Sequence, residues 1–149
     1  MSEVERDMGD KLDITSLKNA AAAFGNALEY AKNVENKPSQ ERASFEFEIT
    51  RAALIHHFEF CFELCWKTMK RYIEMDIGEE ADILTRKDLF RLSAERRLID
   101  DFDRWVYYHR ARNRTSHTYN ENTANEVYEC AKEFDGDLRA FVSTMEQRI

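Results

Sequence analysis

The segment from Glu41 to Ile77 contains no Gly or Pro, and its apolar residues recur every three or four positions. Parts of it, such as Phe45–Ile49, also alternate as a strand does, but only a helix fits the spacing over the whole length. Because a helix with two apolar faces must be covered on most sides, we expect a long helix at the centre of a bundle. The two apolar sets are Phe45, Ile49, Ala52, Ala53, His56, Phe60 and Leu64 in the first, and Leu54, Phe58, Phe62, Cys65, Met69 and Ile73 in the second.

Shorter segments with helical periodicity precede and follow this long one. Their boundaries are marked by an N-cap at Asp13, a stop at Pro38, a stop at Gly78, capping boxes at Thr85–Asp88 and Thr123–Glu126, and an acidic start at Asp100 or Asp101. The chain has only four Gly and one Pro, which is few for the turns of a sheet-rich fold. We therefore predict an all-α fold, an up-and-down antiparallel bundle of about five helices.

The length of 149 residues fits one domain. We expect residues 1–11 to form a flexible lead-in and residues 12–149 a single helical domain. No stretch of 18 apolar residues occurs, and the first ten residues mix acids and bases without an apolar signal core. The three Cys lack the short paired spacing of a disulfide framework. We therefore expect a cytoplasmic protein that does not enter a membrane.

The charge is unevenly distributed along the chain. The net charge is -7, which taken alone disfavours a nucleic acid partner. Between Arg86 and Arg114, however, the sequence contains nine Lys or Arg residues and only five Asp or Glu residues. A local basic patch can attract an anion even when the whole protein is acidic, although such a run also occurs as an ordinary solvated helix face.

The basic segment ends in Arg112-Asn113-Arg114-Thr115-Ser116-His117, an Arg followed by four residues and a His. The Arg can hold a phosphate with its planar donors, and the His can transfer a proton near neutral pH. RNA cleavage through the 2′-hydroxyl needs both functions. The alternative is an Arg on a solvated face and a His that interacts with the dipole of a helix end.

Helix geometry separates the two side chains, because five positions advance about 7.5 Å and turn about 140°. Three arrangements would still bring Arg112 and His117 together. The helix ends near Thr115-Ser116, the Arg side chain folds back, or a two-fold dimer combines residues of two subunits.

The segment from Arg112 to His117, with Asn113 after the Arg, resembles the signature of HEPN ribonucleases, and its extension to Tyr119 resembles the form found in HepT-type toxins. A second string, Phe58 to Lys67 followed by Lys70-Arg71-Tyr72, is similar to proteins called nucleotidyltransferase substrate-binding proteins, the same group under an older name. The resemblance begins near Leu12 and covers most of the chain.

This resemblance implies a single HEPN-type helical bundle over residues 12–149 that forms a homodimer, with an active cleft at the dimer interface. It implies RNA cleavage without metal or cofactor, with Arg112 and His117 as catalytic residues and Asn113 and Arg114 in support. It also implies a minimal nucleotidyltransferase partner, an antitoxin that transfers AMP to Tyr119 and silences the toxin. The alternative is a non-catalytic, substrate-binding subunit of a nucleotidyltransferase complex.

Other polar residues have two interpretations each. His57, Cys61 and Cys65 lie four apart and could bind zinc, but buried Cys packing is the simpler interpretation. Glu59 and Glu63 could form an acid–base pair or surface ion pairs, or they could be buried between subunits or against Arg51 or Arg104. Tyr107, Tyr108 and Tyr119 are the candidates for stacking against RNA bases. His109 could face either the cleft or the core.

Overall fold

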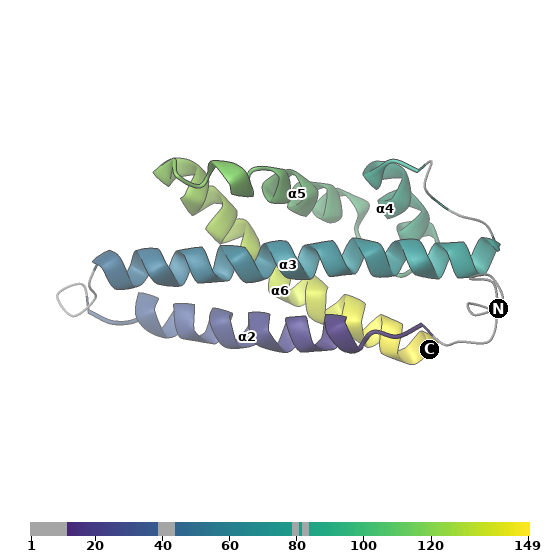
Figure 1. Cartoon of the computed structure of the whole chain (residues 1–149), viewed down its shortest axis with the longest axis horizontal. Coiled ribbons are helices and arrows are strands. Elements are labelled where there is room, and N and C mark those ends of the chain that lie inside the picture. The colour runs from purple at the N-terminus through teal and green to yellow at the C-terminus, as the bar shows by residue number, and fades with distance from the viewer. Residues whose placement is uncertain (1–11, 39–43, 79–80, 82–83) are drawn as a thin grey trace.

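The computed structural model describes residues 12–38, 44–78, 81 and 84–149 (Figure 1). The helices in this part of the chain are α2 (Thr15–Glu35), α3 (Ser44–Ile77), α4 (Arg86–Glu95), α5 (Phe102–Asn113), the short 3-10 helix η1 (Thr115–His117) and α6 (Glu121–Arg148). The all-α prediction is confirmed, and the described α-helices number about five as expected. The expected lead-in over residues 1–11 and the expected start of the long helix at Glu41 lie outside the described residues.

The long helix α3 is the axis of the bundle, with about 50 Å of length from its 34 residues. Helix α2 runs antiparallel to it, since Tyr30 of α2 bonds Glu46 near the start of α3 while Ala20 bonds Cys61 farther along. Helix α6 crosses behind α3, and α4 and α5 lie on one side (Figure 1). The second apolar set, from Leu54 to Ile73, is fully buried against these helices, so that prediction is confirmed.

The first apolar set behaves differently and corrects our expectation of a nearly surrounded helix. Phe45, Ile49 and Phe60 are 71 %, 54 % and 54 % exposed. The reason is that α2, α6 and the α4–α5 pair cover only part of the circumference of α3. In Figure 1 the side of α3 turned toward the viewer carries no helix of the described chain.

Several boundaries follow their sequence signals. Thr85 and Asp88 form both hydrogen bonds of a capping box at the start of α4. The carboxylate of Asp101 accepts bonds from two backbone N–H groups and caps α5. Gly78 ends α3 with a positive φ of 72°, a conformation that glycine adopts without steric cost.

Two predicted caps are wrong in position. The N-cap of α2 is Ile14 rather than Asp13, although the Asp13 carboxylate still accepts a bond from the Thr15 N–H at 2.9 Å. The last helix begins before Thr123, because the side chain of Asn120 accepts from the Thr123 N–H at 3.1 Å and caps α6. An Asn side chain is as good a cap as Thr and comes first along the chain.

A polar network fixes α5 against α6. Arg104 of α5 donates to Asp137 of α6 at 2.8 Å and to the Tyr108 hydroxyl at 2.6 Å, and the same hydroxyl donates to Asp137. Tyr108 is fully buried, so its hydroxyl needs these partners. The network sets the orientation of α5 and therefore of the motif at its end. None of the described helices is long and apolar enough to span a bilayer.

Candidate active site at the end of α5

The Arg–His motif spans a break in helical structure. Helix α5 ends at Asn113, and Thr115, Ser116 and His117 form η1. Two hydroxyls stabilise this turn, since Thr115 Oγ1 donates to the Arg112 carbonyl at 2.8 Å and Thr118 Oγ1 donates to the Thr115 carbonyl at 3.1 Å. The helix thus ends near Thr115, as one of the three arrangements considered from sequence requires, but this end alone does not join Arg112 and His117 in the described chain.

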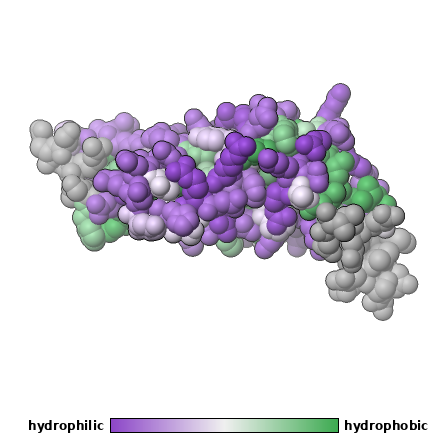
Figure 2. All heavy atoms as spheres, turned by 90° about the horizontal axis from the view of Figure 1, so that it is seen from above, coloured by the Kyte–Doolittle hydropathy of each residue, from purple (hydrophilic) through white to green (hydrophobic). Residues whose placement is uncertain are grey.

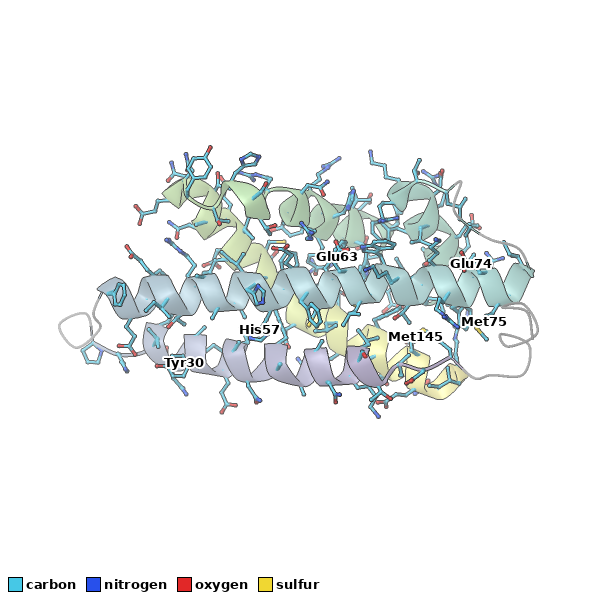
Figure 3. All side chains as sticks on the ribbon, viewed as in Figure 1. Tyr30, His57, Glu63, Glu74, Met75 and Met145 are labelled. Carbon is cyan, nitrogen blue, oxygen red and sulfur yellow. The ribbon has the colours of Figure 1, made fainter. Side chains whose placement is uncertain are left out.

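Arg112 is held by acceptors from α3 and η1. Its Nε donates to Glu63 at 3.0 Å, a terminal nitrogen lies 3.4 Å from Glu59, and the other terminal nitrogen donates to Thr115 Oγ1 at 3.3 Å. Glu63 lies on the side of α3 that faces α5 (Figure 3). A guanidinium has five N–H donors, so two remain for a further ligand. The site therefore contains an oriented, half-buried cation.

This ion pairing also corrects the expected partners of the two acids. In the part of the chain that the structure describes, neither Arg51 nor Arg104 pairs with Glu59 or Glu63. Arg51 donates to Asn125 at 2.7 Å, and Arg104 bonds Asp137 in the network between α5 and α6. The Glu residues follow the spacing of one helix turn, and that spacing lets both carboxylates reach the same guanidinium.

His117 lies on η1, and its side chain is exposed. Its ring approaches Tyr119 edge-on with centroids 6.2 Å apart, and Tyr119 itself is 87 % exposed. Within the described chain, Arg112 and His117 make no direct contact. The chain thus provides the cation and the imidazole on neighbouring turns without joining them.

The two expected supporting residues make separate contacts. Arg114 pairs with Glu126 of α6 at 2.6 Å and so fixes the turn to the next helix. The Asn113 amide lies 3.5 Å from Nε2 of His109. The His109 ring packs against the core residues Phe62 and Phe90. Of the two positions expected for His109, facing the cleft or facing the core, the ring therefore takes the core one.

The surroundings of His109 lower its pKa. Burial is the main cause, because a charged imidazole is disfavoured away from water. The positive charges of Arg86, Arg112 and Lys87 lower the pKa further, whereas Glu63 opposes them. His109 is therefore uncharged at pH 7, and it lies beside Asn113 of the motif.

The aromatic platforms are only partly as predicted. Tyr119 and Tyr107 are exposed, the latter at 41 %, but Tyr108 is buried and cannot stack with a base. The error follows from the two-residue stretch Tyr107-Tyr108, whose side chains point to different faces of α5. Tyr107 borders a groove of about 540 Å³ between α5 and α6.

The basic segment is less positive in the folded protein than its composition indicates. Acids pair with many of its arginines, Asp88 with Arg91 for example, and Asp76 of α3 with Arg96. Arg86 instead lies over the Trp66 ring, 3.1 Å from its centroid. Viewed from the α4–α5 side, the surface is mainly hydrophilic, with hydrophobic patches toward its edges (Figure 2).

A cavity of about 230 Å³ adjoins the motif turn. Thr115 and Thr118 line it from the motif side, and Arg51, His56 and Glu59 line it from α3. Sequence reasoning assigned His56 to an apolar face and did not connect Arg51 with the motif. The spacing of His56 three residues before Glu59 was the available signal, because residues three apart share a helix face.

The cysteines are packing residues. Cys61, Cys65 and Cys130 are all buried, and Cys61 donates to the Ala20 carbonyl at 3.1 Å. Burial raises the pKa of the Cys61 thiol to about 12. Among the residues that the structure describes, no group of three or more His, Cys, Asp or Glu side chains is placed to bind a metal.

Comparisons with known proteins agree with this architecture. Residues 12–147 match the model of a family described as nucleotidyltransferase substrate binding protein like. A Haemophilus influenzae protein named "Probable ribonuclease HepT" is 36 % identical over 99 residues, which cover 65 % of this chain and 68 % of that protein.

Two solved structures share the fold. One from Haemophilus influenzae, described as the fold of a substrate binding domain of a nucleotidyltransferase, has a TM-score of 0.82 and 27 % identity, over 91 % of this chain and 100 % of that one. A crystal structure of a Thermus thermophilus protein has a TM-score of 0.61 and 25 % identity, over 82 % of this chain and 98 % of that one.

Proposed function

Because this chain belongs to the family of nucleotidyltransferase substrate-binding-like, HepT-type proteins, we propose that it is a HEPN-type endoribonuclease whose working domain is residues 12–149. The observation that carries the proposal is the end of α5. There Glu59, Glu63 and Thr115 orient the Arg112 guanidinium beside a turn that presents His117 to solvent. A fixed cation next to an accessible imidazole suits a phosphodiester substrate.

The proposed reaction uses the 2′-hydroxyl of the RNA as nucleophile. The His117 imidazole accepts the hydroxyl proton, and the 2′-oxygen forms a bond to the adjacent phosphorus. The bond from phosphorus to the 5′-oxygen breaks, and that oxygen takes a proton from solvent as it leaves, while His117 later returns to solvent the proton it accepted. The products are a 2′,3′-cyclic phosphate and a 5′-hydroxyl. Arg112 stabilises the negative charge that develops on the phosphoryl oxygens, so this step requires no metal.

Two copies of the chain complete the site in this proposal. Arg112 and His117 of one chain make no contact with each other in the described part, and Glu59 and Glu63 offset the charge of Arg112. A second subunit adds another Arg112 and His117 and gives the shared cleft a second cation. Asn113 and Arg114 support the cleft, since they connect the motif to His109 and to α6.

The decisive assay is cleavage of RNA in EDTA by the purified chain without its partner. Wild type should cut the RNA, and His117→Ala should be at least 100-fold slower, because a positioned general base contributes about 10²–10⁴-fold. A matched His57→Ala variant, which removes a histidine outside the motif, should cut normally. If neither wild type nor His57→Ala cuts any RNA, the nuclease proposal fails.

A minimal nucleotidyltransferase is the proposed partner and antitoxin. It would transfer AMP from ATP to the Tyr119 hydroxyl, whose oxygen bonds to the α-phosphorus while pyrophosphate leaves. The 87 % exposure of Tyr119 makes the hydroxyl accessible. Its ring lies beside His117, so an added phosphate would bring negative charge to the place where the RNA phosphate binds and repel it.

Silencing can be tested separately from cleavage. Wild type incubated with the partner transferase and ATP should gain the mass of AMP and lose nuclease activity. Tyr119→Phe should keep its activity and gain no mass under the same conditions. Silencing of Tyr119→Phe through AMP transfer would refute the assignment of this residue.

A second candidate is a non-catalytic subunit that binds the substrate of a nucleotidyltransferase. It is favoured by the pairing of Arg112 with two carboxylates and by the net charge of -7, since both reduce the attraction of an RNA strand. A stable complex with the transferase together with no RNA cleavage in EDTA would select this candidate.

A further inference from the structure

The Arg86 guanidinium is held by an aromatic ring and not by an acid. Its central carbon lies 3.1 Å from the centroid of the Trp66 ring. Among the described residues, no carboxylate pairs with Arg86 and no acceptor bonds to it. Asp88, two residues further on, is already occupied by Thr85 and Arg91. Because stacking uses the faces of a guanidinium, the N–H groups at its edge stay available to a ligand.

Arg86 lies close to the candidate active site. It is the first residue of α4, and α4 and α5 lie on the same side of α3 (Figure 1). Trp66 follows Glu63 by three positions of α3, about 4.5 Å along the helix axis. Glu63 accepts the Arg112 Nε–H at 3.0 Å (Figure 3). Since residues three apart share a helix face, Arg112 and Arg86 are held over adjoining positions of one face of α3.

The pKa values of nearby groups agree with this placement. Burial lowers the pKa of the Arg86 guanidinium, and the negative charge of Glu63 opposes that shift. The lowered pKa of His109 has burial as its main cause and the charge of Arg86 as the next, ahead of the charges of Arg112 and Lys87. Coulombic effects weaken with distance, so these three cations lie within reach of a single imidazole.

The uncompensated positive charge of this region lies beside Arg112 rather than on it. Glu59 and Glu63 offset the charge of Arg112. Arg86 and Lys87 have no ion-pair partner among the described residues. An anion that reaches Arg112 therefore meets two further cations next to it, and a local cluster of like charges attracts such a ligand even in an acidic protein.

We infer that Arg86, held on the Trp66 ring, binds an RNA phosphate that neighbours the scissile one. A strand with one phosphate at Arg112 continues beyond it, and Arg86 stands in its path along α3. Lys70, one turn past Trp66, lines a cavity of about 210 Å³ together with Trp66 and Arg86 and extends the row of cations. The inference rests on the proposed function, because it assigns a substrate contact of the same site.

This arrangement suits a nucleic acid strand better than an acidic segment of a partner protein. Cations on successive turns of one helix face follow a line, as the phosphates of one strand do. The line includes Arg112, where the strand is cut in the proposed function. An acidic protein surface requires no such continuity with the motif. Because the contact is to phosphate, it should not depend on the identity of the base.

The first test measures binding without cleavage. The probe is a fluorescent, fully 2′-O-methylated RNA of about ten nucleotides, and the readout is fluorescence anisotropy. Arg86→Gln should bind it about tenfold more weakly than wild type, with a salt dependence reduced by about one phosphate contact. Arg86→Lys keeps the charge and should retain most of the affinity. Arg91→Gln, which removes an exposed arginine of the same helix paired with Asp88, should bind as wild type.

The second test addresses the positioning role of Trp66. Trp66→Phe keeps an aromatic face for the guanidinium and should bind the probe nearly as well as wild type. Trp66→Leu removes that face and should lose part of the affinity. In the Arg86→Gln background Trp66→Leu should cause no further loss, because the ring acts only through the arginine. Circular dichroism and Tm should show that every variant is folded.

Cleavage kinetics separate this inference from the proposed function. With an RNA that wild type cuts, Arg86→Gln should raise KM and leave kcat nearly unchanged, because the phosphate it holds does not react. The inference fails if wild type does not bind the probe, or if Arg86→Gln binds it as tightly as Arg91→Gln does. Loss of transferase binding in Arg86→Gln with unchanged RNA binding would assign Arg86 to that partner instead. Binding that depends on Arg86 without any RNA cleavage would retain the RNA contact and refute the nuclease proposal alone.

Discussion

The two halves of the motif differ in how firmly the fold holds them. Arg112, on the last turn of α5, is half-buried and bonded to three acceptors from two elements. His117, on the 3-10 turn that follows, is exposed and approaches only the ring of Tyr119 among the described residues. The fold therefore orients Arg112 in advance and leaves the His117 imidazole free of polar partners within the described chain; in the proposed function these are the phosphate-binding cation and the proton-transferring group.

The difference has a physical origin. A cation that stabilises developing charge works best when its N–H donors are already oriented, because reorganisation during the reaction costs free energy. Holding a guanidinium also requires acceptors, and Glu59 and Glu63 provide them. An imidazole on a short turn lacks such partners within the described chain. The same contrast recurs on α3, where one apolar stripe is packed and the other is open.

Replacement of Arg112 by Gln should have the largest effect and affects both stability and activity. RNA cleavage should fall at least 100-fold with the loss of the cation. The free energy of unfolding should also fall by about 1 kcal/mol, since Glu59 and Glu63 would lose their shared partner. His117→Ala, by contrast, should lose cleavage with an unchanged Tm, because His117 has no ion-pair partner in the described chain. Arg139→Gln, which removes an exposed arginine paired with Asp135, is the matched control and should change neither quantity.

Glu63 tests whether the orientation of Arg112 matters. Glu63→Ala should lower kcat about tenfold with little change in KM, because Nε of Arg112 loses its acceptor. Glu63→Gln keeps an acceptor oxygen and should recover most of the activity. Equal losses in the two variants would mean that the negative charge of Glu63, not its hydrogen bond, is what counts. Glu146→Ala, at a surface ion pair of α6, should behave as wild type.

The lowered pKa of His109 predicts a loss of stability in acid. The folded state holds the proton less tightly than the unfolded state, whose ordinary pKa is 6.5. Stability is therefore complete above pH 6.5 and decreases as the pH falls toward the lower pKa of the folded protein. The drop in Tm between pH 7.5 and 5.5 should be smaller in His109→Phe than in wild type. His117→Ala should keep the wild-type drop, and an equally reduced drop in that variant would contradict the assignment.

The smallest expected change is at the cap that follows the motif. Asn120→Ala removes the side chain that caps α6 and should lower the free energy of unfolding by about 1 kcal/mol, or about 3 °C in Tm. Asn122→Ala, two residues on and exposed, should have no effect. A neutral Asn120→Ala variant would mean that this cap contributes little to the start of α6.

Much of the fold was predictable because it depends on local signals. The helical periodicity of α3, the capping box at Thr85 and the acidic cap at Asp101 act within one helix turn, so a single sequence carries them. Where two local signals competed, the prediction selected the wrong one. Thr123 has a good capping pattern, but Asn120 precedes it and its side chain bonds the Thr123 N–H.

The sequence identified a candidate motif but not the contacts that its residues make. Arg112 and His117 were identified from spacing, chemistry and family resemblance. The pairing of Arg112 with Glu59 and Glu63 spans 49 or more positions of sequence, and no local rule selects those acids over the others. The expectation that Tyr108 lies at the surface was wrong for a similar reason. The packing of α6 against α5 decides which of the two adjacent tyrosines is buried, and no local signal reports it.

The sequence by itself determined the helices, several of their caps and the position of the Arg–His motif, because propensity, periodicity and spacing act over short distances. Tertiary structure decided which face of α3 stays open and which acids hold Arg112, and it left His117 apart from Arg112 within one chain. These outcomes depend on how distant helices pack, and packing is settled by the shape and charge of whole surfaces rather than by neighbouring residues.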